Sequence, residues 1–324
     1  MIHGFIIVDI VYVFNICLTN IVREYTTESC IRPCIRQANC NRNIRPHQSG
    51  TRNPMDMNID QNKLSDLIKQ PLQPASANEL RRCNNVFFVG GELPVNEALE
   101  TMFESFCTES TELFHLSFGA MSTFHRSEEM ARQIKKNFNV RLMGRLSHPA
   151  STQVLERIYA AGVDILDIPP MIFGPAAAGK RDYDRDAWYN ALLSARPVFP
   201  RWSVAATLLA GEESSDSTMS EIDALFDNGI VPLVALAESA AESAAVAIAA
   251  IFRHLASGWK KYDVPIKPFM PMISFMTPLT PMDPPGLFRG LIDRFHDRRL
   301  LVTSDLRRHL RVKHDEDSMD SAAL

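Results

Sequence analysis

The chain has 324 residues, of which 46% are hydrophobic and 22% are charged, and its formal net charge is -4 at pH 7. A chain of this size can bury one sizeable core, and domains of up to about 250 residues are common, so one catalytic domain with short ends is expected. The slight net negative charge argues against binding to nucleic acid through a broadly positive surface. A small-molecule or protein partner is therefore expected.

The segment 1–22 is almost wholly apolar from residue 4 onward and about long enough to cross a bilayer, although Asp9 and Asn15 interrupt it. It is either a membrane helix or a buried strand or helix that leads into the following domain. No basic stretch precedes it, so a signal peptide is not expected. The arginines after it would hold the downstream domain on the cytoplasmic side. We expect a cytoplasmic protein, with membrane association through this segment as the open alternative.

From about residue 86 onward, apolar runs rich in β-branched residues alternate with amphipathic stretches, which is typical of β/α units around a parallel sheet. The first strand is expected at 22–27. Further strands are predicted at 86–89, 112–118, 140–145, 163–168, 202–210 and 230–237. The fold class is therefore α/β, with a barrel over 23–285 and a helical extension with a charged tail over 286–324.

Local signals predict where several helices begin and end. Helix starts are predicted at two capping boxes, Thr218 with Glu221 and Ser239 with Glu242. Left-handed C-caps are predicted at Gly162, Gly229 and Gly258.

Ligands of a parallel barrel bind at the carboxyl ends of its strands, so residues that follow the predicted strands should share one site. The first strand is followed by Cys30, Cys34 and Cys40. The later strands end at or are followed by Gly90, Gly91, Glu92, Ser117, Gly119, Arg145, Ser147, His148, the segment 169–171, Glu212 and Glu213.

Three closely spaced cysteines supply soft thiolate ligands, which select an iron–sulfur cluster or zinc over hard cations. A zinc site completed by His47 and incidental thiols are the alternatives. Cys17, Cys83 and Cys107 are expected to be small buried hydrophobic residues. The same expectation, core or pocket lining, applies to Met270, Met272 and Met276.

The stretch REYTTESCIRPC, followed by VFFVGGELP about fifty residues after Cys40, resembles the radical S-adenosylmethionine enzymes. Further on, AAGVDILDI, WSVAATLLAGEE and DNGIVPLVAL resemble the fifth to seventh strands of the biotin-synthase-like branch. The resemblance covers roughly residues 22–280. The second cysteine gap is five residues in this chain, where two are common in the family.

The resemblance implies a full or partial (β/α) TIM-type barrel that cleaves S-adenosylmethionine reductively and abstracts a substrate hydrogen. It implies a [4Fe-4S] cluster on Cys30, Cys34 and Cys40, and cofactor contacts from Gly90, Gly91, Glu92, Ser117, Arg145 and Glu212. The electron would come from a reductant protein such as a flavodoxin or ferredoxin, and the substrate would be a small molecule. The unusual cysteine gap keeps a second interpretation open, in which a catalytically degenerate barrel acts as a binding or scaffold protein.

Overall fold

The computed structural model describes residues 56–169 and 185–282, and all of them lie within one compact unit. A small two-stranded sheet joins the two ends of this part of the chain, because β1 (Met57–Ile59) pairs antiparallel with β9 (Leu279–Pro281). Helix α2 (Gln61–Lys69) follows β1 and begins after Asp60, whose carboxylate accepts hydrogen bonds from two first-turn amides. Such a cap satisfies amide donors that have no partner within the helix.

Within the residues that the structure describes, the main sheet has seven strands, whose spatial order follows the chain order from β2 to β8. The strands are β2 (Leu80–Cys83), β3 (Val86–Gly90), β4 (Leu113–Ser117), β5 (Arg141–Arg145), β6 (Ile165–Asp167), β7 (Val204–Ala210) and β8 (Val231–Leu236). Among these seven described strands, β2 alone is antiparallel to its neighbour, β3, and every pair from β3 to β8 is parallel.

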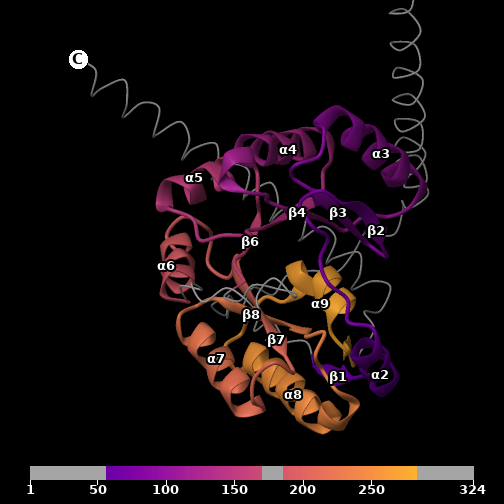
Figure 1. The fold of residues 1–324 in the computed structure, drawn as a ribbon, viewed down its shortest axis with the longest axis vertical. Helices are drawn as coiled ribbons and strands as arrows, with labels where there is room; N and C mark the ends of the chain where they lie inside the picture. Colours follow the sequence, from indigo (N-terminus) through magenta and orange to yellow (C-terminus); the bar gives the residue numbers. More distant parts are fainter. Residues whose placement is uncertain (1–55, 170–184, 283–324) are drawn as a thin grey trace, which may run out of the picture. The chain divides into compact units, whose positions relative to one another are not determined.

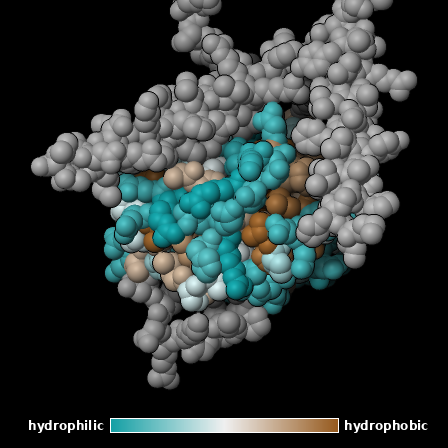
Figure 2. Space-filling model, turned by 90° about the horizontal axis from the view of Figure 1, so that it is seen from above, coloured by the Kyte–Doolittle hydropathy of each residue, from teal (hydrophilic) through white to brown (hydrophobic). Residues whose placement is uncertain are grey.

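Helices connect the parallel strands and lie around the outside of the curved sheet (Figure 1). They are α3 (Val95–Thr108), α4 (Phe124–Asn137), α5 (Thr152–Ala160), α6 (Arg185–Ala195), α7 (Ser215–Asp227) and α8 (Ala245–Lys261). Short 3₁₀ turns precede three of the helices, namely η2 (Met121–Thr123), η3 (Glu242–Ala244) and η4 (Lys267–Phe269). The face where α3 and α4 lie is largely hydrophilic in its coloured part, as expected of the outer faces of amphipathic helices (Figure 2).

Helix α9 (Met270–Met276) lies on the inner side of the sheet and contacts both β3 and β8 (Figure 1). Alternate residues of a strand point to opposite faces. On the outer face, Phe114 packs against Phe138 at the end of α4, with ring centroids 4.9 Å apart. On the inner face, Phe88 packs against Phe275 of α9 at 4.8 Å. The inner side of the sheet is therefore a packed core and not an open channel.

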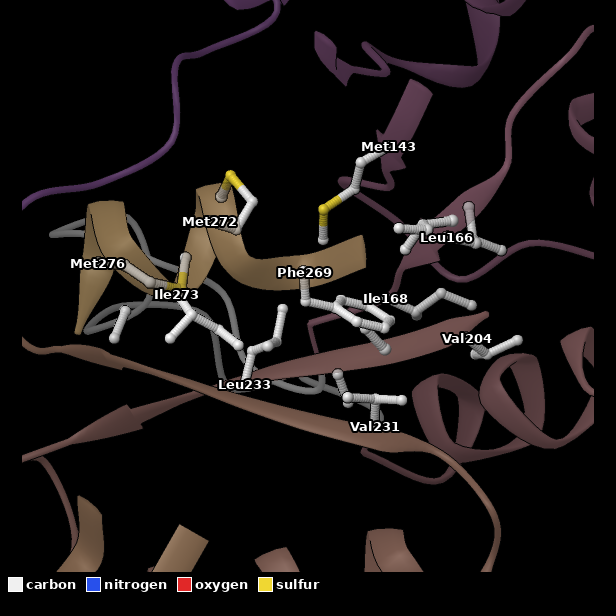
Figure 3. Packing of buried hydrophobic residues seen from close by; sticks show 14 of the residues in the cluster. Met143, Leu166, Ile168, Val204, Val231, Leu233, Phe269, Met272, Ile273 and Met276 are labelled. Atoms are coloured by element: carbon white, nitrogen blue, oxygen red, sulfur yellow. The ribbon is translucent and has the colours of Figure 1, made fainter. Parts of the chain in front are cut away.

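Two of the three methionines predicted as core or pocket lining are buried in this core. Met272 and Met276 belong to the same buried cluster as Met143 and Leu233 from the strands (Figure 3). Met270 is half-buried and packs against the cluster. These contacts are those of core residues.

The six strands predicted from residue 86 onward are confirmed, with bounds that differ by no more than two residues at either end. Within the described ranges β2 and β8 form the two edges of the main sheet, so these residues build a partial β/α barrel. The predicted strand at 22–27, the segment 1–22 and the extension 286–324 lie outside the described residues. No helix in the described part of the chain is long and apolar enough to span a membrane.

Strand β2 was not predicted, because Arg81 and Arg82 give it a polar sequence. The Arg81 guanidinium lies over the Phe88 ring, 5.2 Å from its centroid, so the charged strand still covers apolar surface. Asn84 adopts a positive φ of 51° between β2 and β3, which is a conformation that asparagine tolerates in tight hairpins.

Both predicted capping boxes are wrong. Helix α7 begins after Ser214, whose hydroxyl accepts a hydrogen bond from the Ser217 amide at 3.2 Å, and Thr218 lies inside the helix. At the second position, η3 begins at Glu242 without a side-chain cap. An earlier serine competes for the start of α7, and the local pattern alone does not distinguish the two.

Two of the three predicted glycine caps are confirmed, since Gly162 and Gly229 have φ values of +113° and +68°. The prediction for Gly258 is wrong, because this residue lies inside α8. A Cβ atom at Gly258 would lie 2.1 Å from Cε2 of Phe226 in α7, so glycine is required there by close helix packing.

Candidate functional site at the carboxyl edge of the sheet

Three of the predicted cofactor-binding residues lie in one row at the carboxyl ends of the strands. The strand register places Gly90 opposite Ser117, Ser117 opposite Arg145, and Arg145 opposite Asp167. Directly paired residues of neighbouring parallel strands project to the same face, which here is the inner one. The carboxyl edge therefore gathers a polar row above an apolar inner core.

The Gly-Gly-Glu turn after β3 forms hydrogen bonds with backbone carbonyls of the same chain. The backbone N–H groups of Gly90, Gly91 and Glu92 donate to the carbonyls of Glu79, Ser117 and Ala77, at 2.8, 2.9 and 2.9 Å. A Cβ atom at Gly90 would lie 2.3 Å from the Ala77 carbonyl oxygen, and one at Gly91 would lie 2.2 Å from the Ser127 hydroxyl. The glycines thus permit the segment before β2 and helix α4 to approach this turn closely.

The Glu92 carboxylate holds the loop that follows β4. Its Oε1 atom accepts hydrogen bonds from the Thr123 hydroxyl at 2.8 Å and from the Ala120 amide at 3.0 Å. These two bonds, with a further one from Asn78, lower the pKa of Glu92 below its usual value. A Cβ atom at Gly119 would lie 2.1 Å from Oε1, so the carboxylate occupies the space that a side chain at position 119 would need.

Ser117 and Arg145 also interact with other groups of the protein, through a hydrogen bond and an ion pair. The Ser117 hydroxyl donates to the Ala75 carbonyl at 2.5 Å. Nη1 of Arg145 lies 3.8 Å from Oδ2 of Asp167, and the side chains of the two residues are 11% and 1% exposed. A buried charge requires a partner of opposite sign, and Asp167 supplies it.

Asp167 is further held by Thr207 of β7. Its Oδ1 atom accepts hydrogen bonds from the Thr207 amide at 3.0 Å and from the Thr207 hydroxyl at 2.9 Å. Burial raises the pKa of Asp167, and the charge of Arg145 and the donors of Thr207 oppose this rise. Sequence reasoning missed Asp167 and Thr207. The usable signal was that Asp167 lies one residue before the end of its predicted strand, 163–168, as Arg145 ends the strand predicted before it.

His115 is a third buried polar residue that sequence reasoning missed. It lies two residues before Ser117 on the same face of β4, it is fully buried, and its ring centroid is 5.2 Å from that of Phe88. Within the described residues, neither of its ring nitrogens has a hydrogen-bond partner. Burial and the positive charges of Arg145 and Arg81 lower the pKa of His115 to about 3, so the imidazole is neutral at pH 7.

The other residues predicted at this edge are spread over separate loops. Glu212 is exposed after β7, beside Gly211, which has a φ of +99°. Glu213 accepts a hydrogen bond from the Ser217 hydroxyl at 2.6 Å. The Ser147 hydroxyl donates to the Gly119 carbonyl at 3.1 Å, and burial lowers the pKa of the adjacent His148.

The predicted metal ligands Cys30, Cys34 and Cys40 lie outside the described residues, as does most of the segment 169–171. Among the residues that the structure describes, no group of three or more potential ligands could hold a metal ion. Cys83 is half-buried, whereas Cys107 is exposed, contrary to the expectation that both are buried.

No known protein family and no curated protein matches the sequence. Among solved structures, 7,8-dihydropteroate synthase from Vibrio fischeri ES114 is similar at 10% identity and a TM-score of 0.29, over 55% of this chain and 88% of that one. So low a TM-score carries no argument about fold or function. The assignment of the described residues to a partial β/α barrel rests on the sequential parallel strands and on the helices outside them.

Proposed function

We propose that the chain is a radical S-adenosylmethionine-like barrel that acts as a binding or scaffold protein without radical catalysis. One observation carries this proposal. The polar groups of the Gly-Gly-Glu turn, which would hold the amino acid part of the cofactor, are already bonded to the chain's own atoms.

The residues at this edge therefore do not fit the cofactor in the described arrangement. An ammonium group would have to compete with the Ala120 amide and the Thr123 hydroxyl for Glu92. The backbone of Ala77 occupies the space that a side chain at Gly90 would need. A cofactor carboxylate would likewise have to compete with Asp167 for Arg145.

A second candidate function is the radical enzyme itself, with a [4Fe-4S] cluster on Cys30, Cys34 and Cys40 and electrons from a flavodoxin or ferredoxin. The observation that favours it is the buried row of Ser117, Arg145 and Asp167 at the edge where barrel ligands bind. Buried charges at such an edge are costly for stability and are common at functional sites.

One set of anaerobic measurements on the full-length protein separates the two candidates. After reconstitution with iron, sulfide and a reductant, we would measure bound iron and sulfide, absorption near 400 nm, and release of 5′-deoxyadenosine from S-adenosylmethionine. The first proposal expects unchanged thermal unfolding with and without iron, and no 5′-deoxyadenosine. The radical enzyme would load about four irons per chain and release 5′-deoxyadenosine, and that result would overturn the first proposal.

Single alanine variants test the ligand set in the same assay. If the cysteine bunch binds a cluster, Cys30→Ala, Cys34→Ala and Cys40→Ala should each abolish iron loading. Cys83→Ala and Cys107→Ala are matched controls, because their thiols lie in β2 and α3, away from the bunch in the sequence. Full loading in any one of the first three variants would remove that cysteine from the ligand set.

A further inference from the structure

A cavity of about 720 Å³ lies at the amino ends of β7 and β8, at the opposite edge of the sheet from Gly90 and Arg145. Arg201 and Trp202 line it from the loop before β7, and Gly229 lines it from the turn before β8. Its volume lies within the range of small-molecule sites in proteins, about 300 to 1,000 Å³.

Two arginines give this cavity a positive character. Arg196 and Arg201 are both exposed, and no acidic side chain of the described residues forms an ion pair with either. Asp227, which also lines the cavity, accepts a hydrogen bond from the Tyr262 hydroxyl at 2.6 Å. Two arginines and one aspartate therefore line the cavity. Guanidinium groups bind carboxylates and phosphates with two parallel hydrogen bonds.

Aromatic side chains form the rest of the cavity. The rings of Phe226 and Tyr262 are stacked, with centroids 4.9 Å apart and an interplanar angle of 7°. The Trp202 indole is half-buried, and the Arg201 guanidinium lies 5.4 Å from its centroid. Trp202 has a φ of +61°, which is a rare conformation for a bulky residue and one that glycine would adopt without strain. Strain of this kind is concentrated at functional sites.

We propose that this cavity binds a small organic anion that carries a planar ring. The carboxylate or phosphate group would bind Arg196 and Arg201, and the ring would pack against the Trp202 indole, which the strained backbone presents to the cavity. Phe226 and Tyr262 form the apolar wall. This site is separate from the carboxyl edge, and its existence does not depend on whether the barrel is catalytic.

The test is isothermal titration of the full-length protein with two probes, ADP for a phosphate and indole-3-carboxylate for a carboxylate. Adenosine and inorganic phosphate are the matched controls for ADP, and indole and acetate are those for indole-3-carboxylate, because each lacks either the charge or the ring. Intrinsic fluorescence gives a second readout, since Trp188 and Trp259 are only 4% and 2% exposed and a ligand in the cavity should quench Trp202. At least one probe should bind at least about tenfold more tightly than its controls.

Variants locate the binding. Arg196→Gln and Arg201→Gln should each weaken binding of the probe by about tenfold or more, because a charge-assisted contact is lost. Trp202→Gly should also weaken binding and abolish quenching, and it should fold because glycine suits a positive φ. Arg253→Gln, an exposed arginine on α8 outside this cavity, is the control and should bind as the wild type does.

Three results would overturn the proposal. The first is that neither probe binds more tightly than its own two controls. The second is that the Arg253 variant loses as much affinity as the cavity variants. The third is that a folded Trp202→Gly protein binds as tightly as the wild type. If only ADP binds, the site takes phosphates; if only indole-3-carboxylate binds, it takes carboxylates; either result supports the proposal.

Discussion

Oε1 of Glu92 accepts a hydrogen bond from the Thr123 hydroxyl at 2.8 Å, which ties the turn after β3 to the 3₁₀ turn after β4. We expect Glu92→Gln to lower the urea midpoint of unfolding, and Thr123→Val to do the same. The loss of stability in the double variant should be smaller than the sum of the two single losses. The reason is that Glu92→Gln removes the charge, and Thr123→Val the hydroxyl, of the same hydrogen bond. Additive losses would show that the two residues act separately, and Glu100→Gln, on the exposed side of α3, is the control.

The lowered pKa of Glu92 also predicts a pH dependence. Because the folded state holds the ionised form more strongly, this contribution to stability is present above pH 4.5 and is lost as the pH falls through the folded pKa. The free energy of unfolding, measured in urea at pH 3 to 6, should therefore fall less on acidification for Glu92→Gln than for the wild type. An equal fall in the two proteins would contradict the structural role of Glu92.

The lowered pKa of His115 predicts a second pH dependence, because burial disfavours the protonated imidazole in the folded state. Its folded pKa of about 3 lies below the unfolded value of 6.5, so the unfolded chain binds more protons between these values. The free energy of unfolding should fall as the pH is lowered from 6.5, by up to about 1.4 kcal/mol per pH unit. His115→Leu should remove this contribution. The measurement is urea unfolding at several values from pH 4 to 8.

The control for His115 is His125→Asn, because His125 is exposed on α4. This variant should keep the pH slope of the wild type. The assignment to His115 fails if His115→Leu folds and shows the same slope as the wild type.

The buried pair of Arg145 and Asp167 should be costly to break. Asp167→Asn leaves the guanidinium buried without its opposite charge, and we expect the free energy of unfolding to fall by about 3 to 5 kcal/mol. The double variant Arg145→Met/Asp167→Asn should recover part of this loss. Lys69→Gln is the control, because Lys69 lies 4.0 Å from Glu242 in an exposed pair, and it should cost less than about 1 kcal/mol. A loss of that small size for Asp167→Asn would mean that the pair is not buried as described.

Helix α9 should be essential for stability, since it fills the inner side of the sheet. Phe275→Ala removes the ring that packs against Phe88, and we expect a loss of about 3 to 5 kcal/mol in the free energy of unfolding. Val246→Ala, at a side chain that is 79% exposed, should change stability by no more than about 0.5 kcal/mol. Similar values for the two variants would rule out the packed position of α9.

Local sequence was enough to predict the six strands and the edge where polar residues meet. Runs such as LFHLS and VAATLLA are apolar because parallel strands are buried on both faces, and this requirement acts on each strand separately. Parallel strands also end at one edge, so the row of Ser117 and Arg145 followed from strand ends alone. The two glycine caps at Gly162 and Gly229 were likewise predictable, because a positive φ is a local requirement.

The tertiary structure alone decided which partners these residues have. Glu92 forms hydrogen bonds with residues 28 and 31 positions away in the sequence, and Asp167 forms one with a residue 40 positions away. No local pattern identifies those partners. Gly258 is required by Phe226 on another helix, although it looks like a cap in the sequence. A motif such as Gly-Gly-Glu specifies a turn and a carboxylate. Whether that carboxylate meets a ligand or a loop of the same chain depends on contacts that form only when distant segments pack together.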